Sequence, residues 1–109
     1  MGGIRDHQFG PVIIFGKGGI YTEVWIDISY AIAPLTRQST ERMVQETKCS
    51  EILMGIRGEK GYETNFLFDY IAGLSQLMLD MERVQDIDIN SFVVFHEGGV
   101  AVDVKILAA

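Results

Sequence analysis

Two segments near the C-terminus, residues 86–90 and 100–104, alternate apolar and polar side chains with a period of two. This alternation is typical of β-strands that are buried on one face and exposed on the other. Residues 96–99 between them, His-Glu-Gly-Gly, suit a tight turn. The pattern therefore predicts a β-hairpin at the C-terminal end of the chain.

A turn of two or four residues predicts one register for this hairpin, with Asn90 opposite Lys105, Phe92 opposite Asp103 and Phe95 opposite Val100. One face then carries the apolar residues Ile87, Ile89, Val93, Phe95, Val100, Val102, Val104 and Ile106. The other face carries Asp86, Asp88, Asn90, Asp103 and Lys105. Acidic side chains gathered in this way repel one another unless a cation lies among them.

Asp88, Asn90 and Asp103 are the candidate metal ligands on this polar face. Carboxylate and amide oxygens suit magnesium or calcium and suit zinc poorly. Asp88 and Asn90 lie about 7 Å apart along the strand, and Asp103 is expected as the diagonal neighbour of Asn90. Spacing alone leaves a second interpretation open, in which these residues form an ordinary solvated face of a sheet.

The rest of the chain predicts an antiparallel β framework with two helices. Further strands are expected at residues 12–15, 20–25 and 29–33. Thr36 is a suitable N-cap for a helix that ends near Thr47, and a second helix is expected from Thr64 to Asp80. Gly73 within the second helix predicts a close contact with the sheet. The fold class is α+β, an antiparallel sheet of about five strands with two helices packed on one face.

The glycine-rich segment at residues 16–19 joins two expected strands and has two interpretations. Glycines let backbone amides approach an anion closely, but no helix follows to add its dipole, so a simple hairpin turn is the alternative. Lys17, Gly18, Glu23 and Arg57 are candidate contacts for a nucleotide or its phosphates. Cations in surface loops often have no such role.

Composition limits the function classes. The chain has 109 residues, 48% of them hydrophobic, and a net charge of −6, which together predict one globular domain over residues 1–109 that does not bind nucleic acid. No apolar run is long enough to predict a membrane span. The single cysteine, Cys49, fits a cytoplasmic location. His7 and His96 are isolated and no nucleophile–base set is evident, so no catalytic residue is predicted.

Several stretches in fixed order carry a resemblance to a known family. The first runs from Arg5 to Val24, RDHQFGPVIIFGKGGIYTEV. It is followed by APLTR at 33–37, GIRG at 55–58, LSQL at 74–77 and DIDIN at 86–90 with VD at 102–103. In combination they resemble the C-terminal part of the ATP-grasp domain of ADP-forming acyl-CoA synthetases, such as ADP-forming acetate–CoA ligase and its protein acetyltransferase fusions.

This resemblance implies a reversible reaction that converts acyl-CoA, ADP and phosphate into a carboxylate, CoA and ATP. It implies Mg²⁺ and ATP or ADP as cofactors. In ATP-grasp enzymes an acidic residue and an asparagine on one strand hold magnesium together with an acidic residue on a neighbouring strand. Asp88 and Asn90 match the first pair and Asp103 matches the third ligand, in agreement with the face predicted from alternation alone.

The chain also departs from the family pattern. Ser91 follows Asn90 where proline is usual, and Lys17 stands where leucine is common. The first lobe of the ATP-grasp domain and the phosphohistidine segment have no counterpart, and neither His7 nor His96 matches the phosphorylated histidine. We therefore expect a half-domain that is inactive alone and that works with a missing lobe or with a CoA-binding subunit.

An alternative function is a non-catalytic interaction module that keeps the fold. The apolar strand at residues 12–15 would favour self-association into a homodimer if it lay at a sheet edge. Binding of magnesium and nucleotide distinguishes the two functions.

Overall fold

The computed structural model describes residues 1–16, 28–53, 64–90, 92–95 and 97–109. Its strands are β1 (Gly2–Asp6), β2 (Gly10–Gly16), β3 (Ile28–Ile32), β4 (Val84–Ile89), β5 (Phe92–Phe95), β6 (Gly98–Ala101) and β7 (Val104–Ala108). Its helices are α1 (Arg37–Gln45), α2 (Ser50–Leu53) and α3 (Thr64–Asp80). The strand predicted at residues 20–25 lies outside the described residues.

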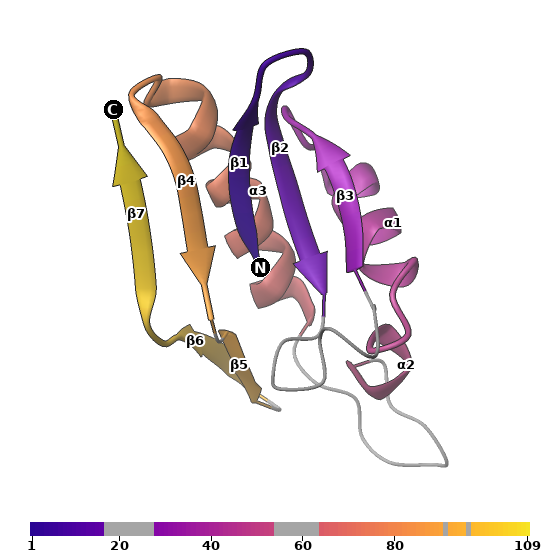
Figure 1. The fold of residues 1–109 in the computed structure, drawn as a ribbon. Helices are drawn as coiled ribbons and strands as arrows, with labels where there is room; N and C mark the ends of the chain where they lie inside the picture. Colours follow the sequence, from indigo (N-terminus) through magenta and orange to yellow (C-terminus); the bar gives the residue numbers. More distant parts are fainter. Residues whose placement is uncertain (17–27, 54–63, 91, 96) are drawn as a thin grey trace.

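Five strands form one antiparallel sheet in the order β3-β2-β1-β4-β7, and β5 and β6 form a separate two-stranded sheet. Helices α1 and α3 lie behind the five-stranded sheet and cover one of its faces, as Figure 1 shows. This arrangement confirms the predicted α+β class. Among the described helices, none is long and apolar enough to cross a membrane.

Strand β1 lies at the centre of this sheet. Of the five described strands in the sheet, it is the one that the sequence pattern did not predict. It begins Gly2-Gly3, and both glycines are buried. A Cβ atom on Gly2 would lie 2.4 Å from the carbonyl oxygen of Ile87 on β4, so the pairing of β1 with β4 requires glycine there. Because β2 pairs with β1 on one side and β3 on the other, the stretch 12–15 is internal, so the condition set for its self-association, a position at a sheet edge, is not met.

The turn between β1 and β2 is closed by Asp6. One carboxylate oxygen of Asp6 accepts hydrogen bonds from the backbone N–H groups of Gln8 at 2.8 Å and Phe9 at 3.0 Å. These bonds favour the charged carboxylate and lower the pKa of Asp6 below its usual value. The stabilisation is therefore present above the ordinary aspartate pKa and is lost as the pH falls through the lowered one.

Both predicted helices are present. Thr36 caps α1: its side-chain oxygen accepts from the Ser39 N–H at 3.1 Å, and the Ser39 hydroxyl accepts from the Thr36 N–H at 2.8 Å. Helix α3 has the predicted limits. The prediction for Gly73 is wrong, because this residue is exposed on α3 and no atom of the other described segments lies within 4 Å of a Cβ placed there.

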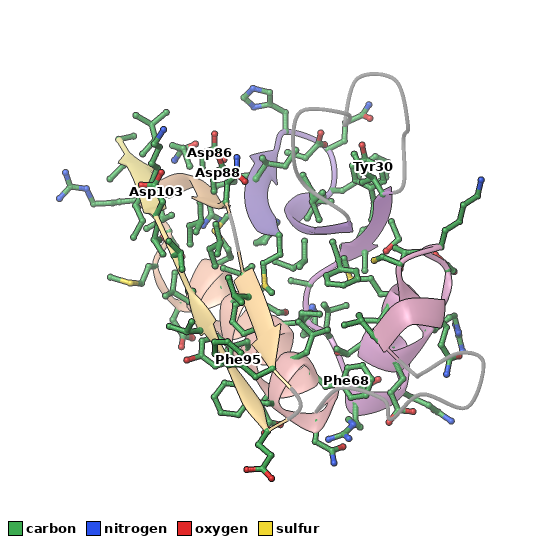
Figure 2. All side chains as sticks on the ribbon, turned by 90° about the horizontal axis from the view of Figure 1, so that it is seen from below. Tyr30, Phe68, Asp86, Asp88, Phe95 and Asp103 are labelled. Carbon is green, nitrogen blue, oxygen red and sulfur yellow. The ribbon has the colours of Figure 1, made fainter. Side chains whose placement is uncertain are left out.

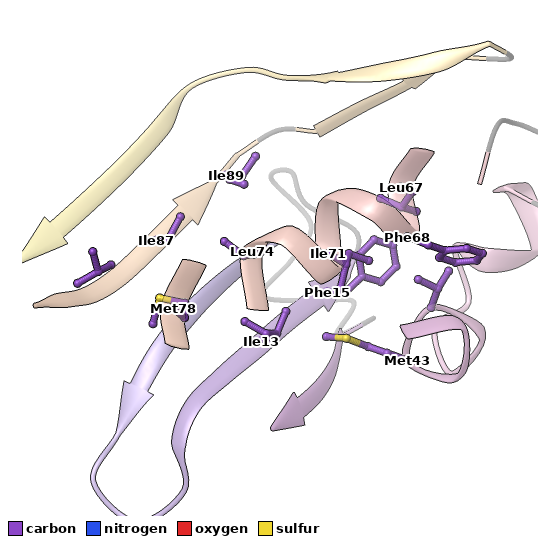
Figure 3. Packing of buried hydrophobic residues seen from close by; sticks show 12 residues of the cluster. Ile13, Phe15, Met43, Leu67, Phe68, Ile71, Leu74, Met78, Ile87 and Ile89 are labelled. Carbon is purple, nitrogen blue, oxygen red and sulfur yellow. The ribbon is translucent and has the colours of Figure 1, made fainter. Parts of the chain in front are cut away.

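The core lies between α1, α3 and the covered face of the sheet (Figure 3). Ile13 of β2 and Ile71 of α3 are fully buried at its centre. The cluster consists of Ile13, Phe15, Met43, Val44, Leu67, Phe68, Ile71, Leu74, Met78, Val84, Ile87 and Ile89. Its position leaves the opposite face of the sheet uncovered by any described helix.

Candidate metal and phosphate site

The face of the five-stranded sheet turned away from α1 and α3 is called here the open face. Cross-strand pairing gives one continuous row across it, and a parallel row lies beside the first. The first row is Tyr30, Ile14, Gly2, Asp88 and Lys105, and the second is Ile32, Val12, Ile4, Asp86 and Leu107. The open face is thus apolar over β3 and β2 and carries charge over β4 and β7.

The predicted hairpin register is wrong by two residues. Lys105 lies opposite Asp88 and not opposite Asn90, and Phe95 lies opposite Gly98 and not opposite Val100. Phe92 lies opposite Ala101 where Asp103 was expected. The cause is that Gly98 and Gly99, which were expected in the turn, belong to strand β6. In the β4–β7 ladder a shift of two residues keeps each side chain on its predicted face, since side chains alternate with a period of two. In the β5–β6 hairpin the predicted faces are exchanged, because Phe92 and Ala101 pack against the core whereas Val93 and Val100 are exposed.

The hairpin is also interrupted between its two ladders. At this break the N–H of Asn90 donates to the carbonyl oxygen of Asp103 at 3.4 Å, so these residues are direct and not diagonal neighbours. Asp103 has a φ of 57°, in the left-handed region that aspartate tolerates better than most residues. Two of the three candidate ligands therefore lie at the point where β4 and β7 separate from β5 and β6.

The carboxylates of Asp88 and Asp103 are exposed at this edge of the sheet, as is that of Asp86 (Figure 2). Within the described part of the chain, neither Asp88 nor Asp103 has a side-chain hydrogen bond or an ion pair. Such carboxylates retain their full capacity to bind a cation.

The candidate set is not a complete metal site by itself. Among the described residues, no three His, Cys, Asp or Glu side chains are grouped closely enough to hold a metal ion together. Asp88 and Asp103 supply two carboxylates and Asn90 supplies an amide oxygen. This donor set fits magnesium, which commonly takes one or two carboxylates and completes its coordination with water and phosphate oxygens.

The predicted apolar face is buried only in part. Ile87 and Ile89 belong to the core, but Phe95 is 50% exposed, Val104 49% and Ile106 58%. The reason is that α3 packs against β1, β2 and β6 and does not extend beneath β7. The expectation that all eight apolar residues share one face with the core is therefore wrong for β7 and for the β5–β6 hairpin, where Phe92 and Ala101 pack against the core instead.

The candidate phosphate contacts Lys17, Gly18, Glu23 and Arg57 lie outside the described residues. His7 is exposed in the β1–β2 turn, and Cys49 is half-buried.

Two of the sequence stretches that carry the family resemblance meet away from the open face. The N–H of Leu35, in the stretch 33–37, donates to the hydroxyl of Ser75, in the stretch 74–77, at 3.1 Å. Ser75 is 2% exposed. In the same region the Arg37 guanidinium lies 4.8 Å from the centre of the Phe68 ring. These residues join α1 to α3 and have a structural role.

A family model of the ATP-grasp domain matches residues 1–107 of this chain. The chain belongs to the ATP-grasp family. The predicted family is thus confirmed over nearly the whole sequence, and the five-stranded sheet with its two covering helices is an ATP-grasp structure.

Curated relatives are ADP-forming ligases. This ATP-grasp chain is 44% identical over 103 residues to acetate–CoA ligase [ADP-forming] I of Archaeoglobus fulgidus, covering 94% of the chain and 15% of that protein. It is 38% identical over 107 residues to acetate–CoA ligase [ADP-forming] I subunit beta of Pyrococcus furiosus, covering 98% of the chain and 46% of that subunit. The chain thus corresponds to part of the ATP-grasp domain of such ligases.

A solved structure has the same fold. The dinucleotide forming acetyl-coenzyme A synthetase 1 of Ca. Korarchaeum cryptofilum, in complex with coenzyme A and Mg-AMPPCP, superposes with a TM-score of 0.93. The two proteins are 31% identical, and the match covers 99% of this chain and 51% of the other. The chain therefore spans about half of that structure and less than half of the ligases named above.

Proposed function

We propose that the open face of this ATP-grasp domain binds the phosphates of ATP or ADP through a magnesium ion held by Asp88, Asn90 and Asp103. The observation that carries the proposal is the pair of exposed carboxylates, Asp88 and Asp103, beside Asn90 at the end of β4. The structural relative in complex with Mg-AMPPCP supports the choice of ligand. The reaction served is the reversible conversion of acyl-CoA, ADP and phosphate into a carboxylate, CoA and ATP.

The proposed chemistry is electrostatic. Magnesium bound by two carboxylates and an amide oxygen keeps positions free for phosphate oxygens. An ion in that place bridges the nucleotide phosphates and offsets charge that develops on the transferred phosphoryl group. The residues of this chain supply the ligands and their orientation, and we assign no catalytic residue among them.

We further propose that a second lobe, in the same protein or in a CoA-binding subunit, covers the open face and encloses the nucleotide. The apolar part of the open face supports this proposal, since Tyr30 is 62% exposed, Ile32 51% and Ile4 38%. A continuous apolar surface on a sheet is typical of a contact with another part of a protein. On this proposal the chain is inactive without the covering lobe.

A second candidate function, self-association, is favoured by strand β7. It lies at the end of the described sheet, and all five of its residues are exposed. An edge strand of this kind offers unpaired backbone groups to a second strand. This candidate requires no metal and no nucleotide.

Titration calorimetry of the purified chain with ADP, with and without magnesium, tests the first function. We expect binding that requires magnesium. The absence of binding under both conditions would contradict the first function. If the chain then also had the mass of a dimer in analytical ultracentrifugation, self-association would be the better account.

A further inference from the structure

Lys105 of β7 lies on the open face but has no role among the proposed metal ligands. It lies directly opposite Asp88 in the β4–β7 ladder and is exposed. Directly opposed residues in an antiparallel pair have Cβ atoms about 5 Å apart, so the Lys105 ammonium has the surroundings of the proposed metal ion within its reach. Among the described residues, Lys105 forms no ion pair with any acidic side chain.

The side-chain charges around Lys105 are otherwise acidic. Asp88 lies opposite it, Asp86 is the diagonal neighbour on β4, and Asp103 precedes it by two residues. No other described strand residue on the open face carries a positive charge. Lys105 is thus the one positively charged side chain among the described strand residues of this face, and it lies beside the place proposed for the phosphates. The N-terminal ammonium of Met1, which donates to the Ile89 carbonyl, also lies near Asp88.

A charge balance gives this position a function. The negative charges of Asp88 and Asp103 together equal the charge of one magnesium ion, so the metal centre coordinates phosphate oxygens but leaves the negative charge of the nucleotide uncompensated. The negative charge of the nucleotide then requires a further cation. Lysine is well suited to this purpose, because its ammonium is a compact charge with several donors on a flexible stem.

We propose that Lys105 binds a phosphate group of the nucleotide and positions it against the magnesium ion. This inference rests on the proposed function, since it requires a metal-bound nucleotide on the open face. Lys105 contacts the ligand directly and takes no part in proton transfer. The competing role is a cross-strand partner of Asp88 that only stabilises the sheet.

The experiment compares Lys105→Met with Lys105→Arg by calorimetric titration with Mg-ADP. Methionine removes the charge and keeps an apolar stem, whereas arginine keeps the charge. We expect the methionine variant to bind roughly tenfold more weakly or worse, and the arginine variant to stay within about threefold of the unmodified chain. Arg42→Met on α1, an exposed residue on the covered side of the sheet, makes the same change in net charge and should bind normally.

The possible failures are distinguishable. If the unmodified chain does not bind Mg-ADP, the proposed function itself is wrong. If the unmodified chain binds and Lys105→Met binds equally well, the phosphate contact is wrong while the proposed function stands. A purely structural Lys105 would lower the urea midpoint of unfolding in Lys105→Met and leave the nucleotide affinity unchanged, and this result also overturns the inference.

Discussion

Replacing Arg5 by methionine is expected to lower the free energy of unfolding by about 2–4 kcal/mol. The Arg5 guanidinium donates from Nε to the Val84 carbonyl at 3.0 Å and from Nη2 to the carbonyls of Met78 at 2.6 Å and Met81 at 3.1 Å. Hydrogen bonds to a charged group contribute about 1.5–3 kcal/mol each. Because the bond to Met81 is exposed and its carbonyl also accepts from the Val84 N–H, the expected loss is smaller than the sum of three such bonds. Urea unfolding followed by circular dichroism measures the change.

Arg83→Met is the matched control. Arg83 donates one hydrogen bond, from Nε to the carbonyl of Ala109 at 2.8 Å, and it is exposed. Its replacement should change the free energy of unfolding by less than about 0.5 kcal/mol. Equal losses in the two variants would contradict the role assigned to Arg5, which is to fasten central strand β1 to the end of α3 and the start of β4.

Asp88→Asn and Asp103→Asn are each expected to weaken magnesium-dependent binding of ADP by at least about tenfold. Each change keeps the shape of the side chain but removes a negative charge from the proposed metal centre. A neutral amide is a much weaker ligand for a hard divalent cation than a carboxylate is. Calorimetric titration at fixed magnesium concentration measures the dissociation constants.

Asp86→Asn provides the control for this pair. Asp86 lies on the same strand and the same face as Asp88, but its cross-strand partner is Leu107 and it is farther from Asn90. We expect its affinity to stay within about threefold of the unmodified chain. All three variants should fold normally, since the side chains are exposed. Similar losses in all three would indicate general charge attraction in place of a defined site.

The helices and the faces of β4 could be predicted from the sequence because local patterns determine them. Thr36 and Ser39 stand at the spacing of a capping box, and the apolar stripe of α3 has a helical period. Alternation placed Asp88 and Lys105 on one face, and this survived an error in register, since a shift of two residues preserves the face.

Other features depend on contacts between distant segments and left no local signal. Strand β1 begins with two glycines, whose lack of side chains permits close pairing with β4 but removes the alternation that identifies a strand. The three carbonyl partners of Arg5 are more than 70 residues away along the chain. Gly73 suggested a close contact, yet only the orientation of α3 decides which of its faces meets the sheet.

The central claim is that the open face near the break between β4 and β5 holds a metal-bound nucleotide. Paramagnetic relaxation in NMR spectra tests it most directly, with Mn²⁺ and ADP added to the isotope-labelled chain and Mg²⁺ as the diamagnetic reference. We predict the strongest broadening at the backbone amides of Asp88, Asn90 and Asp103, with little effect on α1. Broadening that is strongest elsewhere, or equal over the whole chain, would contradict the claim.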